Sequence, residues 1–258
     1  MDYETIRLRE RDGVAVLTLR RPDKMNALNT QMRAEILHAV RAAEGMARVL
    51  VMTGQGRAFC SGQDLGDRAN VADINLERTL RDEYEPMLRA IFDCGVPTIA
   101  AVNGPAAGAG ANLALACDVV MATESAVFLQ AFTRIGLIPD AGGTYWLPRQ
   151  MGVARAMGAA LFAEPVSARQ AAAWGMIWEA VPDADFEAHW NERARHLARG
   201  PGVAYASVKR AIRGSFDNDL DAQLALEAKL QGEAGRSRDF QEGVLAFLEK
   251  RPARFEGR

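Results

Sequence analysis

Residues 97–122, PTIAAVNGPAAGAGANLALACDVVMA, contain the pattern that decides the fold. The apolar run over 97–102 predicts a buried strand, and the Asn-Gly pair after it turns the chain away. Small residues then lead into an alanine-rich helix over 109–117, and the chain returns to an apolar strand at 118–122. A strand, a glycine-rich turn, a helix and a second strand are typical of an α/β core.

The same alternation continues on the N-terminal side of this stretch. Residues 14–19 and 49–52 are aliphatic runs that predict strands, and apolar residues recur at helical spacing over 31–43. A second helical face runs over 76–91, where Pro86 should kink or split the helix.

Helices dominate the last third of the chain. Two capping boxes, Ser167 with Gln170 and Asp239 with Glu242, predict helix starts there. We therefore expect a core domain over 1–195 and a helical appendage over 196–258. The appendage has apolar side chains on one face, which either a partner subunit or its own core must cover: Leu220, Leu224 and Leu230.

Composition and charge narrow the class of protein. The 258 residues are 49% hydrophobic and 25% charged with a formal net charge of −2, which argues against a disordered or nucleic-acid-binding chain. The charged N-terminus does not resemble a signal peptide, and no run of 18 apolar residues could span a membrane. Three cysteines without CxxC spacing are typical of reduced core thiols: Cys60, Cys94 and Cys117. We expect a cytoplasmic globular protein.

Several common catalytic patterns are missing from the sequence. It contains no GxSxG, HExxH, Walker or EF-hand motif, and no cluster of metal ligands is expected. The three histidines, His38, His189 and His196, lie in predicted helices remote from the glycine-rich turns. A dinucleotide fingerprint beginning at Gly108 fails because its third glycine is replaced by Leu113.

Three segments could carry chemistry. The turns at 58–65 and 108–110 each offer backbone N–H groups that could converge on one oxygen as an oxyanion hole, or each is simply a tight corner. The third segment is 136–144, GLIPDAGGT, where Asp140 lies among apolar residues. Desolvation there would raise its pKa and make it a general base near neutral pH, although a helix N-cap is an equal alternative.

Five segments in order resemble the motifs of the crotonase (enoyl-CoA hydratase/isomerase) superfamily. They are 21–28 (RPDKMNAL), 58–65 (AFCSGQDL), 103–110 (NGPAAGAG), 136–144 (GLIPDAGGT) and 242–251 (EGVLAFLEKR). Within the superfamily, three segments are most similar to the branch of bacterial ring-1,2-epoxyphenylacetyl-CoA isomerases: 103–111, 136–144 and 174–178 (WGMIW). The resemblance implies the crotonase-like (ClpP/crotonase) α/β fold, a spiral of ββα units whose C-terminal helices form a homotrimer or a dimer of trimers.

The resemblance also implies an acyl-CoA thioester whose carbonyl oxygen accepts from two backbone N–H groups. No further cofactor is implied, because coenzyme A is part of the substrate. By motif the two donors belong to Gln63 and Ala109, which join Asp140 as the expected catalytic residues. It places these residues at the CoA and acyl sites: Lys24, Ala27, Ala58, Ser61, Gly62, Asp64, Leu65, Gly108, Asn112, Phe132, Gly143, Phe247 and Lys250. The last two are expected to reach the ligand of a neighbouring subunit. Asp64 and Asp118 are interpreted as structural acids.

The acids depart from the hydratase pattern, in which two glutamates add water. Asn112 and Phe132 stand at the matching positions, so Asp140 is the motif acid left to face the substrate. One base can move a proton between two carbons while the oxyanion hole stabilises the enolate. We therefore expect an acyl-CoA isomerase, acting on a 3-enoyl-CoA to give the 2-enoyl-CoA or on ring-epoxyphenylacetyl-CoA to give the oxepin.

Three alternatives stay open on the same fold. The chain could retain enoyl-CoA hydratase activity, use Asp140 as the nucleophile of an aryl-CoA dehalogenase, or be a non-catalytic CoA- or RNA-binding assembly protein. The loop over 66–75 and the helix after it are expected to shape the acyl pocket without identifying the acyl group.

Overall fold

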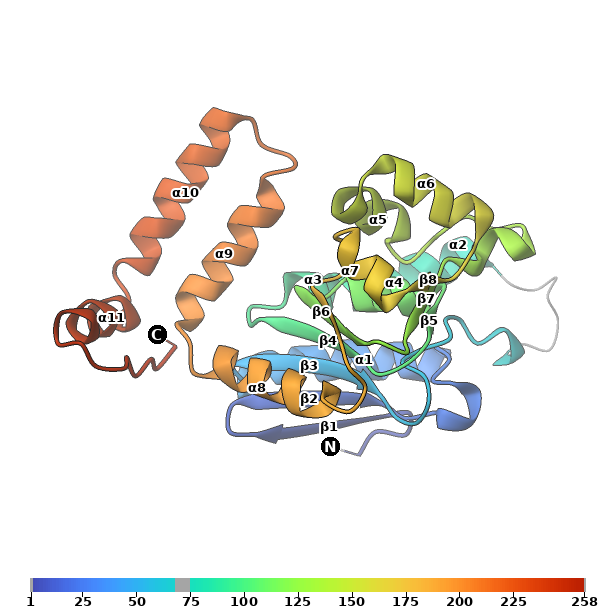
Figure 1. Ribbon diagram of the computed structural model, residues 1–258, viewed down its shortest axis with the longest axis horizontal. Coiled ribbons are helices and arrows are strands. Elements are labelled where there is room, and N and C mark those ends of the chain that lie inside the picture. The colour runs from blue at the N-terminus through green and yellow to red at the C-terminus, as the bar shows by residue number, and fades with distance from the viewer. Residues whose placement is uncertain (1, 68–74, 258) are drawn as a thin grey trace.

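The computed structural model describes residues 2–67 and 75–257. Its main sheet has six strands in the spatial order β1-β2-β3-β4-β6-β9 (Figure 1). Their bounds are β1 (Ile6–Arg11), β2 (Val14–Leu19), β3 (Val49–Gly54), β4 (Thr98–Val102), β6 (Val119–Thr123) and β9 (Glu179–Val181). Strand β1 pairs antiparallel with β2, and every other neighbouring pair is parallel. The carboxyl ends of the parallel strands therefore share one edge, where the glycine-rich turns begin.

A second, small sheet stands beyond this edge. It consists of β5 (Ala106–Ala107), β7 (Val127–Leu129) and β8 (Val166–Ser167), with β5 parallel and β8 antiparallel to β7. An isolated bridge between Cys60 and Ala106 links it to the turn that follows β3.

Eleven α-helices lie within the described residues. They are α1 (Thr30–Met46), α2 (Leu76–Thr79), α3 (Glu85–Asp93), α4 (Ala109–Leu115), α5 (Gly143–Met151), α6 (Val153–Phe162), α7 (Ala168–Ala173), α8 (Phe186–Ala198), α9 (Gly202–Gly214), α10 (Leu220–Ala234) and α11 (Arg238–Leu248). Short helical turns occur at η1 (Pro22–Lys24), η2 (Leu65–Asp67) and η5 (Ala131–Ile135), and a π-helical turn occurs at η4 (Leu80–Tyr84). None of the helices in this part of the chain has the length and apolar character needed to cross a bilayer.

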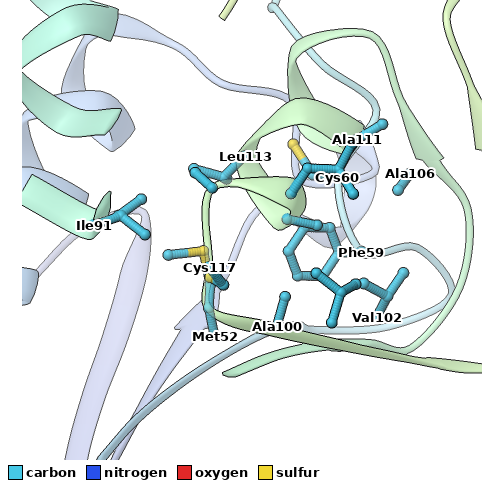
Figure 2. Close-up of a cluster of buried hydrophobic side chains, with 14 of the residues drawn as sticks. Met52, Phe59, Cys60, Ile91, Ala100, Val102, Ala106, Ala111, Leu113 and Cys117 are labelled. Atoms are coloured by element: carbon cyan, nitrogen blue, oxygen red, sulfur yellow. The ribbon is translucent and has the colours of Figure 1, made fainter. Parts of the chain in front are cut away.

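The parallel strands are buried on both faces, as their unbroken apolar runs require. Leu17 and Met52 belong to a large core cluster with residues of α1, α3 and α4, whereas Val51 and Ile99 pack with α8 on the other face. Figure 2 shows part of the larger cluster, where Phe59 of the turn after β3 is drawn among side chains of β4 and α4.

Helices α9, α10 and α11 project away from this core (Figure 1). Asp118, just before β6, forms ion pairs with Lys209 and Arg213 of α9, which fixes the base of the projection. The apolar side chains of α11 are exposed in the single chain, including Phe247 at 83%. Residue 195, the expected end of the core domain, lies inside α8, so the projecting part begins only at α9.

Most of the elements expected from the sequence are present. The strands at 14–19, 49–52, 97–102 and 118–122 correspond to β2, β3, β4 and β6, within a residue or two at their ends. The helix expected over 76–91 is interrupted by the π-helical turn η4, directly before Pro86, which lies in the first turn of α3.

Two local features differ from the sequence expectation. The sequence analysis missed β1, the edge strand, because most of its side chains are charged and exposed. The capping box at Asp239 is wrong, since the N-cap of α11 is Ser237 and Asp239 is buried, accepting from the N–H groups of Glu256 and Gly257. Ser167 and Gln170 do form the expected capping box of α7. The loop expected at 66–75 falls largely on 68–74, outside the described residues.

Candidate active site

The two small-residue turns lie against each other. The N–H of Ala107 donates to the carbonyl oxygen of Cys60 at 2.9 Å. A Cβ on Gly62, which has φ of +97°, would lie 2.8 Å from the Ala107 carbonyl oxygen and 3.4 Å from the Ala109 nitrogen. Only glycine permits this approach, so Gly62 brings the segment before Gln63 next to the start of α4.

Each turn contains a backbone N–H that has no acceptor among the described residues, at Gln63 in the first turn and at Ala109 in the second. Leu28 donates to the carbonyl of Gly62 at 2.7 Å and accepts from the N–H of Asp64 at 3.1 Å, a parallel bridge that does not use the N–H of Gln63. Ala109 is the first residue of α4, so its N–H has no acceptor within the helix. Within residues 2–67 and 75–257, neither N–H has a hydrogen-bond acceptor. Two free donors therefore occur on adjoining turns.

Asp140 is a desolvated carboxyl group rather than a helix cap. Helix α5 begins at Gly143 with Gly142 as its N-cap and no side-chain cap, so the N-cap alternative is wrong. The Oδ1 atom of Asp140 is buried and has no hydrogen-bond partner within residues 2–67 and 75–257. Burial raises the pKa of Asp140 to about 6, against a smaller lowering by its own backbone N–H.

Asp140 lines a largely apolar cavity of about 590 Å³. The described walls come from η4 and α3 on one side, and from the loop 138–142 and the first turn of α5 on the other. Aromatic and aliphatic side chains dominate the lining: Leu80, Tyr84, Leu88, Phe92, Ile138, Pro139, Tyr145 and Trp146. Three rings form a contact cluster at one end, with centroid distances of 5.2 Å for Phe92–Trp146 and 4.7 Å for Tyr145–Trp146.

Charged groups at this cavity are few and mostly exposed. Among the described lining residues, Glu85 is the only acid besides Asp140, and it is paired with Arg89 at 2.9 Å on the surface of α3. Arg81 also lines the cavity and pairs with Glu77. Asp140 is thus the one unpaired acid of the described lining, half-buried and with its Oδ1 shielded from solvent. Among the described residues, no three His, Cys, Asp or Glu side chains lie close enough together to coordinate a metal ion.

Sequence reasoning missed the buried ion pair that supports the cavity wall. Arg33 of α1 donates to the Glu83 carboxylate and, at 2.7 Å, to the carbonyl of Leu28. Arg33 thereby links η4, which forms part of the cavity wall, to Leu28, the residue that bridges to Gln63 in the first turn.

The Arg33 guanidinium also lies over the ring of Tyr84, 4.8 Å from its centroid. Burial raises the pKa of Tyr84, whose hydroxyl also feels the charge of Asp140. The sequence contained one signal for the ion pair with Glu83: Arg33 directly follows Met32 in the chain and lies on the buried side of α1.

The two residues that replace the hydratase acids have different surroundings. Phe132 is buried in η5, and a Cβ on Gly108 would lie 3.7 Å from its ring. Asn112, expected to contact the substrate, is fully buried, and both ends of its amide are bonded within the chain. Gly143 packs against that amide.

The residues expected near CoA form a continuous rim beside the first turn. Lys24 ends η1, and its carbonyl accepts from the Ser61 hydroxyl at 3.3 Å, while Leu65 is 55% exposed. Ala27 and Ala58 are buried beneath this rim.

Asp64 has the structural partner expected of it. Its carboxylate accepts from Arg21 at 2.8 Å. Burial acts to raise the pKa of Asp64, but hydrogen bonds from Arg21 and from the N–H of Gly66 outweigh it, so the pKa is lowered. Asp118 is likewise held in ion pairs with α9.

Phe247 and Lys250 do not join this site within one chain. Phe247 lies in α11 and Lys250 follows it, on the projecting helices at the opposite end of the molecule from η5 and α6 (Figure 1). Their reach towards the ligand of a neighbouring subunit stays a prediction.

Comparisons with known proteins agree with this architecture. The family model described as enoyl-CoA hydratase/isomerase matches residues 9–258. A probable enoyl-CoA hydratase of Rhodobacter capsulatus is 65% identical over 258 residues, covering 100% of both chains. The 1,2-epoxyphenylacetyl-CoA isomerase of Escherichia coli K12 is 46% identical over 252 residues, covering 95% of this chain and 96% of its own.

A solved structure gives the same result for the fold. The crystal structure of a putative enoyl-CoA hydratase/isomerase from Mycobacterium abscessus superposes with a TM-score of 0.93 at 36% identity, covering 98% of this chain and 100% of that one. The crotonase fold expected from the motifs is confirmed. The chain belongs to the enoyl-CoA hydratase/isomerase family, the crotonase superfamily.

Proposed function

We propose that this protein is an acyl-CoA isomerase in which Asp140 moves a proton between two carbons of the acyl group. The observation that carries the proposal is a half-buried carboxyl whose buried Oδ1 has no partner among the described residues, at a cavity whose described lining contains only one other acid, the paired Glu85. Two free backbone N–H groups on the adjoining turns, from Gln63 and Ala109, supply the thioester oxyanion hole.

The proton transfer balances without a co-reactant. For a 3-enoyl-CoA, the Asp140 carboxylate takes a proton from the α-carbon, and the electron pair moves into the thioester to give a dienolate. The two N–H donors stabilise the oxygen on which the charge develops, and each such donor is typically worth about 10²–10³ in rate. The carboxylic acid then returns the proton to the γ-carbon, giving the 2-enoyl-CoA. A pKa of about 6 suits this exchange, since the carboxylate predominates at neutral pH and still holds a proton well.

The lining of the cavity favours an aromatic or ring-derived acyl group. Tyr84, Phe92, Tyr145 and Trp146 contribute aromatic side chains to the lining that also contains Asp140. Offset and edge-to-face ring contacts add about 0.5–1.5 kcal/mol beyond the burial of apolar area. The 46% identity to an enzyme named 1,2-epoxyphenylacetyl-CoA isomerase supports the same substrate class. We therefore place ring-epoxyphenylacetyl-CoA first among the substrates and 3-enoyl-CoA second. With the ring epoxide, the carbon–carbon bond bridged by the epoxide oxygen breaks to give the seven-membered oxepin ring, and Asp140 moves a proton from the α-carbon to a ring carbon, so the product is an isomer and no co-reactant is needed.

Hydration is the second candidate, favoured by the 65% identity to an enzyme named probable enoyl-CoA hydratase. Adding water across a double bond needs one group to activate the water and one to protonate carbon. A single buried acid supports that chemistry less well than a proton shuttle, and the bulk of Phe132 beside Gly108 leaves little room for a water there.

The test is isomerisation in heavy water. Wild type, Asp140→Asn and the control Asp93→Asn are each incubated with ring-epoxyphenylacetyl-CoA and, separately, with a 3-enoyl-CoA. Asp93 is an exposed acid at the end of α3, so its variant controls for loss of one carboxylate elsewhere. Mass spectrometry and NMR then locate deuterium and any added oxygen.

We expect wild type and Asp93→Asn to form the isomer with deuterium at the carbons that exchange protons. Asp140→Asn should lose about 10²–10⁴ in kcat, the usual contribution of a general acid–base. Isomerisation unchanged in Asp140→Asn refutes the proposal. A product heavier by one water indicates a hydratase, and a covalent aryl or acyl adduct on Asp140 indicates the nucleophilic alternative.

A further inference from the structure

Asn112 makes a contact that no catalytic role for its own side chain requires. It lies in the middle of α4 with 0% exposure, among alanine and leucine side chains. Its Nδ2 donates to the backbone carbonyl of Asp140 at 2.7 Å, and its Oδ1 accepts from the Nε2 of Gln130 at 2.9 Å. Gln130 is itself 2% exposed and directly precedes η5. A buried amide that lacked such partners would be destabilising, because its donors and acceptor would lose their hydrogen bonds to water without replacement.

This amide connects the two halves of the proposed machinery. Asn112 lies three residues after Ala109, one turn along the same helix, and its own N–H donates to the carbonyl of Gly108. The segment that presents the free N–H of Ala109 is thus tied by one side chain to the backbone of Asp140. The Asp140 carbonyl accepts a second bond from the N–H of Gly143 at 2.8 Å, so it is held from both sides.

The loop after Asp140 needs such an anchor. Ala141 has φ of +48° and Gly142 has φ of +83°, both in the left-handed region. For a residue with a Cβ this conformation is strained, so Ala141 stays there only if neighbouring contacts hold the chain. A Cβ on Gly143 would lie 2.5 Å from the Nδ2 of Asn112, which explains why a glycine follows at that position.

We infer that Asn112 is a positioning residue, which sets the Asp140 carboxyl relative to the backbone N–H of Ala109. The inference rests on the proposed function for its effect on turnover, but its effect on the carboxyl itself can be measured without turnover. Asn112 touches no reacting atom and acts through the Asp140 backbone.

The variants separate positioning from general stability. The first variant, Asn112→Leu, keeps a side chain of similar volume but removes both hydrogen bonds. The second variant, Asn112→Ala, also removes them but leaves a small cavity, and it is used if the leucine variant does not fold. The matched control is Thr98→Val. Thr98 is 1% exposed and also makes two side-chain hydrogen bonds, to Asp118, but it lies at the start of β4, the opposite end from the turns.

Two readouts are compared across these variants. The first is kcat and KM for isomerisation. The second is the titration of the Asp140 carboxyl by carbon-13 NMR of aspartate-labelled protein, assigned by difference with Asp140→Asn. Wild type should titrate near 6. Tyr84 interacts electrostatically with this carboxyl, and its own pKa is raised by burial; Arg33 and Cys60 act in turn on Tyr84. The charged groups that line the same cavity are Arg81, Glu85 and Arg89.

We expect either Asn112 variant to lower kcat about 10²-fold, as a displacement near 1 Å does, with KM changed less than about threefold. The Asp140 titration should move from about 6 towards the ordinary value of 3.8, because a loop released from α4 exposes its carboxyl to water. The Thr98→Val variant should be less stable than wild type, but its kcat, its KM and its Asp140 titration should be the same as in wild type.

The inference is overturned if a folded Asn112 variant has the wild-type Asp140 titration and the wild-type kcat. It is also overturned if Thr98→Val changes both readouts as much as the Asn112 variants do. A shifted titration in the Asn112 variants supports the positioning role even where the heavy-water test has refuted isomerisation. The two proposals therefore fail separately.

Discussion

Asp140→Asn is expected to stabilise the folded protein while removing the proposed base. Burial raises the pKa of Asp140 from 3.8 to about 6. At neutral pH the carboxylate is therefore less stable in the folded protein than in the unfolded chain, where water solvates it. At about 1.4 kcal/mol per pH unit, that difference corresponds to about 3 kcal/mol, an upper figure because the unfolded chain and solvent relaxation reduce it. Asparagine has nearly the same shape and carries no charge.

The sign of the pH dependence follows from proton binding. Between about pH 4 and 6 the folded state binds more protons at this site than the unfolded state, so wild type loses stability as pH rises through that range. Below about pH 4 both states are protonated, and the two proteins should be almost equally stable. Above about pH 6 the full advantage of the variant should appear.

The assay is urea denaturation of wild type, Asp140→Asn and Asp93→Asn at about pH 4 and about pH 7.5. We expect Asp140→Asn to gain about 1–3 kcal/mol in the free energy of unfolding at the higher pH and little at the lower one. Asp93→Asn should show no such pH-dependent gain. A variant less stable than wild type at the higher pH, or a gain that does not depend on pH, refutes the assignment of Asp140 as a desolvated carboxylate.

Three further changes test the surroundings of the site. Gly143→Ala places a Cβ 2.5 Å from the Asn112 nitrogen, so the amide must leave the Asp140 carbonyl, and steady-state kinetics should show kcat falling about tenfold or more. Ala109→Pro removes one proposed oxyanion donor at a first helical position, which tolerates proline, so kcat should fall about 10²–10³-fold while circular dichroism stays unchanged. Asp118→Asn breaks the buried pairs that hold α9, and denaturation should show a loss of about 3–5 kcal/mol. Wild-type behaviour of any of these variants contradicts the role given to its residue.

Much of the core could be predicted because its signals are local. The aliphatic runs that became β2, β3 and β4 are buried on both faces and need no partner information to be recognised. The two glycine-rich turns could also be recognised from the sequence, and the structure places Gly62 of one turn beside the start of α4. This contact with Ala109 depends on the absence of a side chain at Gly62, which the sequence displays directly. The convergence of the two backbone donors on one oxygen stays a prediction.

The features that sequence reasoning missed depend on distant partners. Asn112 and Asp140 are 28 residues apart, and nothing local indicates that the amide of one holds the carbonyl of the other. Likewise Arg33 and Glu83 are separated by 50 residues. The cap of α11 was misplaced for a different reason, because Asp239 at the start of a helix suits a capping box, while its real partners are backbone N–H groups near the C-terminus.

The central claim is that one carboxyl and two backbone N–H groups converge on a thioester. The most direct measurement is a crystal structure of Asp140→Asn with a bound 3-enoyl-CoA or ring-epoxyphenylacetyl-CoA. Our account predicts the thioester oxygen about 2.7–3.1 Å from the nitrogens of both Gln63 and Ala109, with the side chain of residue 140 facing the α-carbon. A thioester oxygen bound elsewhere, or a side chain at 140 turned towards bulk solvent, would contradict it.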